Sequence, residues 1–158
     1  MVNFVDTSVL VNLLKVPFMC DQYDELKQEY DRCFANKDIF VIPMAAIVET
    51  GNHIAQIQDG NKRWEVMERF INLVKNACQQ NNNMSVMPNL SYEEIQNALL
   101  SFQNNIHNKI GYGDATIVEQ FNTYWRDKQP IGEMRIWSID RHLQDYHQTG
   151  GLARRKTR

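Results

Sequence analysis

Apolar residues along this chain follow two alternating patterns. Short apolar runs have the length and composition of buried β-strands, and they occupy residues 2–5, 39–42, 85–87 and 134–139. Between these runs, apolar residues recur every three to four positions, which predicts amphipathic helices. Strands that alternate with helices in this way predict an α/β fold, with a parallel sheet of four to five strands and helices on both faces.

Several residues mark where the predicted helices begin and end. Pro17 stops the helix after the first strand, and Pro43 is well placed as the first residue of the helix after the second. A capping box of Ser91 and Glu94 starts another helix, and the turn at residues 111–113 precedes the next. We expect residues 1–150 to form one domain, large enough to bury a proper core.

Two predicted helices carry unusual faces. After Pro43, Glu49 lies among small and polar residues that leave room for a substrate, opposite an apolar side that we expect to be buried. That side consists of Met44, Ile47, Val48, Gly51, Ile54 and Ala55. The helix over residues 61–80 has two apolar stripes, so it packs either wholly in the core or partly against a second copy or a partner.

Four acidic residues lie at the ends of apolar segments: Asp6, Glu49, Asp114 and Asp140. Ligands of an open α/β sheet bind beyond the carboxyl ends of its strands, so these side chains can converge in one cleft. Two carboxylates about 5 Å apart repel by about 3 kcal/mol at an effective dielectric constant near 20, and such a cluster requires protonation or a bound cation. An all-oxygen set of ligands favours magnesium or manganese.

Each acid by itself also has an ordinary structural explanation. Asp6 could open a turn, Asp114 could cap a helix, and Asp140 could form an Asx turn. Glu49 could be an exposed helix residue. One metal site accounts for all four residues, whereas four separate structural explanations would all have to be true at once.

Composition limits the partners and the compartment. The 158 residues carry 17 basic and 19 acidic side chains, and four of the basic ones lie in the tail of residues 151–158. A globally basic surface for nucleic acid is therefore excluded, and the tail is either a local basic patch or a solvated terminus. Three unpaired cysteines, with no signal peptide and no apolar run of about 20 residues, lead us to expect a cytoplasmic protein with no membrane contact.

Taken together, these residues resemble the motifs of PIN-domain nucleases of the VapC toxin type. The four motifs occur in the family's order and cover nearly the whole chain. They are Phe4-Val5-Asp6-Thr7-Ser8-Val9-Leu10, Ile47-Val48-Glu49, Gly113-Asp114-Ala115-Thr116-Ile117-Val118 and Ser138-Ile139-Asp140-Arg141-His142-Leu143. The resemblance implies a PIN-like three-layer fold, in which a central parallel sheet is flanked by helices.

The resemblance also implies a magnesium- or manganese-dependent endoribonuclease that hydrolyses RNA phosphodiester bonds. On this interpretation Asp6 and Asp114 ligate the metal directly, and Asp140 ligates it directly or through water. Glu49 acts through water or orients the attacking nucleophile. The expected partners are the RNA substrate, a small antitoxin protein and a second copy of the chain in a homodimer.

Four further residues are candidates for substrate contact or support of the site. By resemblance, Thr7 helps to place the metal or the phosphate, and Ser138 supports the geometry. Arg141 could approach the phosphates or could simply be solvated. His53, four residues after the second acid, either contacts phosphate or solvent or forms a Glu–His metal pair. Ser8 is expected to cap the first helix.

Other functions stay open. The protein could be a PIN nuclease of RNA processing or defence instead of a toxin, or a PIN-like module that binds RNA or protein without cutting. The intact acidic set speaks against the module, because a protein that binds no metal has no reason to retain four carboxylates that repel one another. Phosphatases of the haloacid dehalogenase type are disfavoured, since they require a second Asp where this chain has Ser8. The chain also lacks the Gly-rich phosphate-binding loops of nucleotide-binding proteins.

Overall fold

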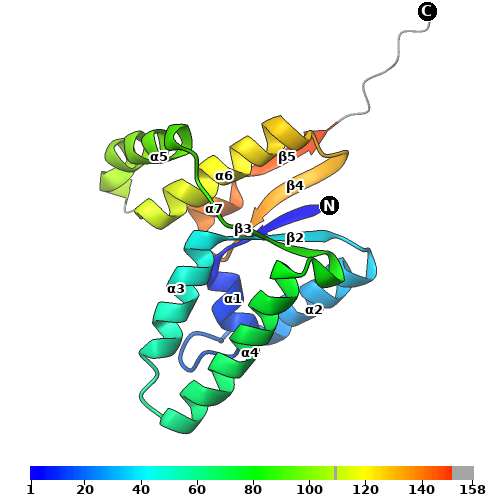
Figure 1. The fold of residues 1–158 in the computed structure, drawn as a ribbon, viewed down its shortest axis with the longest axis vertical. Helices are drawn as coiled ribbons and strands as arrows, with labels where there is room; N and C mark the ends of the chain where they lie inside the picture. The colour runs from blue at the N-terminus through cyan, green and yellow to red at the C-terminus, as the bar shows by residue number, and fades with distance from the viewer. Residues whose placement is uncertain (109, 151–158) are drawn as a thin grey trace, which may run out of the picture.

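Five strands form one sheet between two layers of helices in the computed structural model, which describes residues 1–108 and 110–150 (Figure 1). The strands are β1 (Val2–Val5), β2 (Ile39–Pro43), β3 (Met84–Met87), β4 (Gly132–Trp137) and β5 (His147–Gly150), and their order in the sheet is β3-β2-β1-β4-β5. This arrangement confirms the expected three-layer α/β fold. The predicted basic tail, residues 151–158, lies outside the described residues.

The central strand β1 determines where the candidate acids can meet. It runs parallel to both β2 and β4, with Phe4 beside Val41 on one side and Ile136 on the other. The carboxyl ends of these three strands therefore lie along one edge of the sheet. Strand β5 is antiparallel to β4, and the sequence pattern did not predict it, because its first three residues are polar and exposed at the sheet edge.

Seven α-helices surround the sheet in the described residues, together with two short 3₁₀ turns. Figure 1 shows α5 and α6 on one side of the sheet and α1, α2 and α4 on the other. Their bounds are α1 (Thr7–Leu13), α2 (Tyr23–Ala35), α3 (Met44–Ala55), α4 (Gly60–Cys78), α5 (Tyr92–Asn105), α6 (Tyr112–Lys128) and α7 (Arg141–Gln144). Within the described part of the chain, none of these helices has the length and apolarity to span a membrane.

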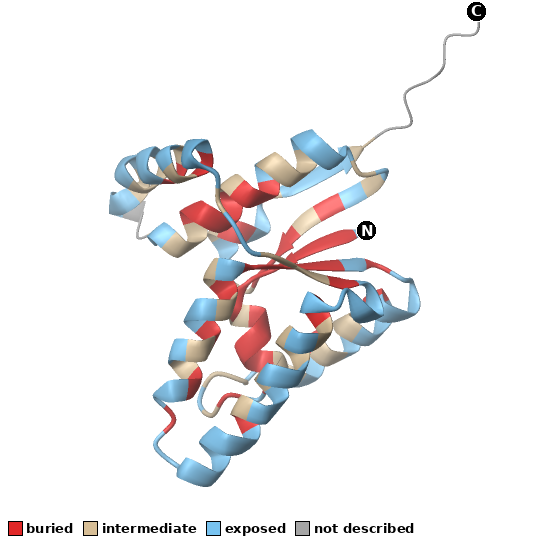
Figure 2. Cartoon of the chain, viewed as in Figure 1, coloured by how far each residue is buried: buried red, intermediate tan, exposed pale blue. Residues whose placement is uncertain are grey.

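Aromatic side chains fill the core on both faces of the sheet. The buried ring of Phe4 meets the rings of Phe121 and Tyr124 on α6 edge to face, with centroids 5.6 and 5.3 Å apart. From the neighbouring strand, Phe40 packs against Tyr30 on α2 at 5.1 Å. Figure 2 shows that burial is concentrated in β1, β2 and α1, whereas α4 and α5 are largely exposed. The core thus fixes the central strands that precede the candidate site.

The apolar side predicted for α3 is partly right and partly wrong: Ile54 is buried and Ile47 packs against the core, but Met44, Val48 and Ala55 are exposed. The helix buries Ala46, Thr50 and Ile54, whereas Val48 is 54% exposed and Met44 is 37% exposed. The reason is that α3 packs closely against α1 and α4, and small side chains at a spacing of four residues allow that approach. The larger side chains Met44 and Val48 instead line a cleft.

The two apolar stripes of α4 have different environments. Val66 and Ala77 are buried in the core, and Phe70 and Leu73 pack against it. The other stripe is more open, and Trp64 on it is 61% exposed. Core packing therefore explains one stripe, and a partner or dimer surface along the other stays a prediction.

Truncating a central core residue is expected to destabilise the protein strongly. We expect Phe121→Ala to lower the free energy of unfolding by about 3–5 kcal/mol, because it removes the ring that packs on Phe4 and leaves a cavity. Tyr92→Ala is the control, since Tyr92 is 89% exposed and its loss should change stability by about 0.5 kcal/mol or less. Urea denaturation measures both changes, and equal losses would contradict this description of the core.

Candidate active site

Asp6 stands where β1 ends and α1 begins, and one of its carboxyl oxygens is fully engaged. Oδ2 accepts hydrogen bonds from the backbone N–H of Ser8 at 3.2 Å, from the Ser8 hydroxyl at 2.6 Å and from the Ser138 hydroxyl at 2.8 Å. Among the described residues, no hydrogen-bond donor reaches Oδ1. The carboxylate is therefore held in place through one oxygen, and the other remains for a ligand.

Two serine hydroxyls connect the ends of β1 and β4. The Ser8 hydroxyl accepts the backbone N–H of Ile139 at 3.0 Å, and the Ser138 hydroxyl accepts that of Asp140 at 3.0 Å. The expectation that Ser8 caps α1 is wrong, because Asp6 is the N-cap residue and accepts the Ser8 N–H. The structure places Ser138 between the first and fourth acids, where it bonds the side chain of one and the backbone of the other.

Glu49 approaches this region from α3. Its Oε2 accepts a hydrogen bond from the Thr7 hydroxyl at 2.9 Å, and its Oε1 lies 3.9 Å from Nε2 of His53. The contact with His53 confirms that residues 49 and 53 share one side of the helix. Thr7 follows Asp6 directly, so the hydrogen bond from Thr7 brings the second acid beside the first.

Asp114 lies in the first turn of α6, as predicted. Its Oδ2 accepts the backbone N–H of Gly111 at 3.1 Å and lies 3.3 Å from Nε2 of His142. Sequence reasoning did not select His142, and the one signal for it was its position two residues after the fourth acid. Gly113 is also close to α3, since a Cβ atom built on it would lie 3.9 Å from Oε2 of Glu49.

The surroundings of Asp140 disfavour the charged form of its carboxyl group. Its pKa is raised above the ordinary value, first because neighbouring atoms displace water from the carboxyl group. The negative charges of Asp6 and Asp114 raise the pKa further, whereas His142 lowers it. Asp140 therefore lies within the electrostatic influence of both Asp6 and Asp114. Glu49 is connected to the same region through its hydrogen bond from Thr7.

The donor chemistry of these residues suits a hard cation. All four acids offer oxygen ligands, which magnesium and manganese prefer, and Asp6 and Asp114 each engage only one carboxyl oxygen. In the described residues, however, no group of three or more His, Cys, Asp or Glu side chains is close enough together to hold a metal ion. The acids therefore offer suitable oxygen ligands, but their present positions do not form a complete coordination sphere.

A cleft of about 460 Å³ opens beside Glu49 and Asp114. Its other lining residues come from α3, from the segment after β3 and from α6, and they include Met44, Val48, Asn52, Leu90, Tyr112 and Gln120. Of the four predicted supporting residues, none lines this cleft: Thr7 and Ser138 contact the acids, His53 borders a different cavity, and Arg141 is exposed on α7.

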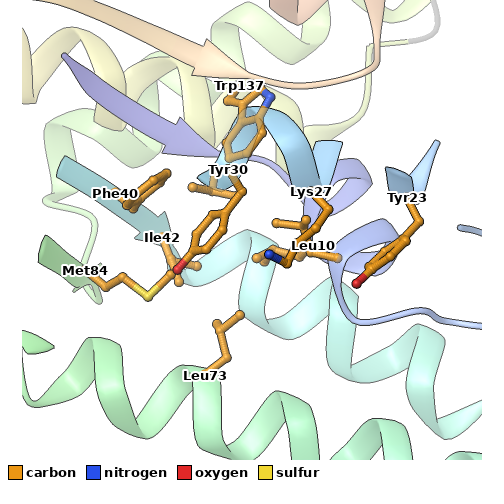
Figure 3. Close-up of a pocket in the computed structure, with 11 residues that line it drawn as sticks. Leu10, Tyr23, Lys27, Tyr30, Phe40, Ile42, Leu73, Met84 and Trp137 are labelled. Atoms are coloured by element: carbon orange, nitrogen blue, oxygen red, sulfur yellow. The ribbon is translucent and has the colours of Figure 1, made fainter. Parts of the chain in front are cut away.

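A smaller pocket of about 210 Å³ lies between the sheet and helices α1, α2 and α4 (Figure 3). Figure 3 shows Tyr30, Phe40 and Trp137 along one part of it, with Leu73 of α4 across from them. Most of its lining is apolar, although Lys27 of α2 also borders it. Sequence analysis did not identify this pocket, because its residues come from seven separate elements: β1, α1, α2, β2, α4, β3 and β4.

The mostly parallel five-stranded sheet and its flanking helices match the PIN-like fold that the motif resemblance implied. Among solved structures, the chain is similar to VapC20 of Mycobacterium tuberculosis, a toxin described as cleaving the sarcin-ricin loop, with a TM-score of 0.59. The match is 14% identical in sequence and covers 91% of this chain and 95% of that chain. Comparisons with protein-family models and with curated proteins found no match.

The raised pKa of Asp140 predicts that its charge destabilises the metal-free protein. The folded protein holds this proton more tightly than the unfolded chain, so stability falls as the pH rises from the ordinary carboxyl pKa through the raised one. We expect Asp140→Asn to melt at a higher temperature than the wild type at pH 7 in EDTA. The difference should vanish in acid, and a variant that is less stable at pH 7 would contradict this explanation.

Proposed function

We propose that the protein is a metal-dependent endoribonuclease that hydrolyses phosphodiester bonds in RNA with Mg²⁺ or Mn²⁺. The proposal rests on one observation: the negative charges of Asp6 and Asp114 raise the pKa of the Asp140 carboxyl group, at the sheet edge where β1 and β4 both end. A cluster of like charges there is unfavourable unless a cation balances it. Ligands of open α/β sheets bind at this edge.

Each of these residues would have a distinct role. Asp6 and Asp114 would hold the cation through their Oδ1 atoms, which accept no hydrogen bond from the described residues, with Asp140 beside them. When bound, such a cation polarises the phosphodiester and activates water for an in-line attack. Glu49, fixed by the Thr7 hydroxyl, is positioned to accept a proton or to orient the attacking water. Ser138 keeps Asp6 in place, and Arg141 is available to a phosphate at the exposed rim.

A role as the toxin of a toxin–antitoxin pair is part of the proposal. VapC20, which shares the fold, is described as a toxin that cleaves the sarcin-ricin loop, and we propose that this chain likewise cleaves a defined loop of an RNA. The proposed inhibitor is a small antitoxin protein, and the apolar pocket bordered by Leu73 and Lys27 would receive one of its apolar side chains. We further propose a homodimer that uses the exposed stripe of α4 around Trp64.

A PIN-like module that binds RNA or protein without cutting is the second candidate. One observation favours it: no group of three potential metal ligands is closely assembled in the described residues. The nuclease remains the stronger candidate, because a module released from catalysis gains nothing from placing Asp140 where the charges of Asp6 and Asp114 repel it.

Cleavage of labelled RNA tests the nuclease. The panel contains single-stranded RNAs, tRNA and a sarcin-ricin loop hairpin, each incubated with Mg²⁺, Mn²⁺ or EDTA. We expect the wild type to cut at least one RNA with metal, and Asp6→Asn to be slower by about 100-fold or more, since a ligand should cost at least as much as an outer-shell partner. The amide can still accept from Ser8, so the fold should be retained.

Asp21→Asn is the matched control, since it removes one negative charge from an exposed residue that lies outside the site. Equal rates for wild type, Asp6→Asn and Asp21→Asn would contradict the assignment. If no RNA is cut and Mn²⁺ does not bind, the non-cutting module is the better description.

Expression in a bacterial host tests the toxin role. We expect induction of the wild type to arrest growth and induction of Asp6→Asn to leave growth unchanged, because arrest requires cleavage. Coexpression of a small protein that binds the wild type should restore growth, and Leu73→Glu should weaken that rescue by placing a charge in the apolar pocket. Normal growth with a cleavage-competent wild type would instead favour an RNA-processing nuclease.

A further inference from the structure

We propose that the cleft beside Glu49 and Asp114 binds one unpaired nucleobase of the RNA, next to the bond that is cut. This inference rests on the proposed function, and it concerns how the same site would select its substrate. The residues that would hold the base are Tyr112, Met44 and Val48, and those that would read its edge are Gln120 and Asn52.

The size and walls of the cleft suit a base. Its volume of about 460 Å³ is within the range of roughly 300–1,000 Å³ that is typical of small-ligand pockets. Tyr112 lines the cleft, and its ring is braced by Phe102, whose ring meets it edge to face with centroids 6.0 Å apart. Unpaired RNA bases stack on aromatic side chains of this kind.

The exposure of two apolar residues on α3 supports a ligand at this position. Met44 and Val48 occur one turn apart, remain 37% and 54% exposed, and line the cleft next to Glu49. The exposed apolar surface of Met44 and Val48 lies next to the carboxylates. A flat, uncharged ring could cover this apolar surface while the carboxylates keep their contact with water. Asn52 continues the same side of the helix by one more turn and carries both a donor and an acceptor.

Gln120 supplies a fixed polar group in the cleft. The residue is 2% exposed, and its amide nitrogen donates to the backbone carbonyls of Asn89 at 3.1 Å and Met87 at 3.5 Å. These two bonds orient the side-chain amide and leave its carbonyl oxygen as an acceptor. Among the described residues no donor is bonded to that oxygen, so it can accept from the amino group of adenine, cytosine or guanine. Uracil has no amino group, and the one Watson–Crick donor that it offers, the ring N3–H, lies between two carbonyl oxygens that the carboxylates and the Gln120 oxygen would repel, so we expect it to bind least well.

The position of the cleft relates the base to the chemistry. Glu49 and Asp114 belong to the cleft lining as well as to the acidic cluster, so the phosphate of a base held there would lie at the acids. Its negative charge would be repelled by them without a cation, and binding should therefore depend on the metal.

Binding of mononucleotides tests the inference without any cleavage. AMP, CMP, GMP and UMP are titrated into the full chain with Mg²⁺, and binding is followed by NMR chemical shifts. We expect the first three to shift the signals of Tyr112 and Asn52 and to bind more tightly than UMP. Tyr112→Leu should weaken AMP binding by about tenfold, as loss of one stacked base does. Tyr92→Leu is the matched control, since it changes an exposed tyrosine at the start of α5.

The outcomes separate this inference from the nuclease itself. Shifts at the cleft that disappear in Tyr112→Leu support the base pocket even if no RNA is cut, in which case the proposed nuclease fails alone. The base pocket is overturned if no nucleotide shifts the cleft, if UMP binds as well as the others, or if Tyr112→Leu behaves like Tyr92→Leu. Metal-dependent RNA cleavage with an unchanged base preference in Tyr112→Leu would also overturn the pocket while leaving the nuclease intact.

Discussion

The carboxyl group of Asp6 joins the two strands on which the candidate site is built. Its Oδ2 accepts from Ser8 at the start of α1 and from Ser138 after β4, and these serines in turn accept the backbone N–H groups of Ile139 and Asp140. Hydrogen bonds to a charged group contribute about 1.5–3 kcal/mol each, and a buried carboxylate without them would be strongly unfavourable. Two of the other acids take their positions relative to this junction, because Thr7 holds Glu49 and the segment after Ser138 carries Asp140.

The same junction places like charges where they oppose folding. Asp140 has a raised pKa because water is displaced from it and because Asp6 and Asp114 are negative, so the metal-free site is a source of instability. His142 offsets part of this by its position beside Asp114. A cation would convert the repulsion into attraction, which links the proposed activity to the stability of the fold. The adjoining cleft adds apolar and amide groups that a charged cluster alone would not provide.

The elements with the strongest local signals were predictable from the sequence. The apolar runs of β1, β2, β3 and β4 predict an α/β fold with a largely parallel sheet. Asp6 and Asp140 lie at the same edge of that sheet because β1 and β4 are neighbouring parallel strands that end there. The partners of those acids were not predictable, since Ser8 and Ser138 are 130 residues apart and only the pairing of β1 with β4 brings them together. The buried side of α3 was predicted only in part: Ile54 is buried as expected, but burial of Ala46 and Thr50 depends on how closely the neighbouring helices approach and not on hydropathy. Strand β5 has no apolar pattern, because it lies at an edge and pairs through its backbone.

A crystal structure of the protein grown with Mn²⁺ would test the central claim most directly. Anomalous scattering locates manganese without any assumption about the ligands. The account predicts an ion bound by carboxyl oxygens of Asp6 and Asp114 at about 2.1 Å, with Asp140 beside it directly or through water. Carboxylates that stay apart, with manganese bound elsewhere or nowhere in a crystal saturated with it, would contradict the account.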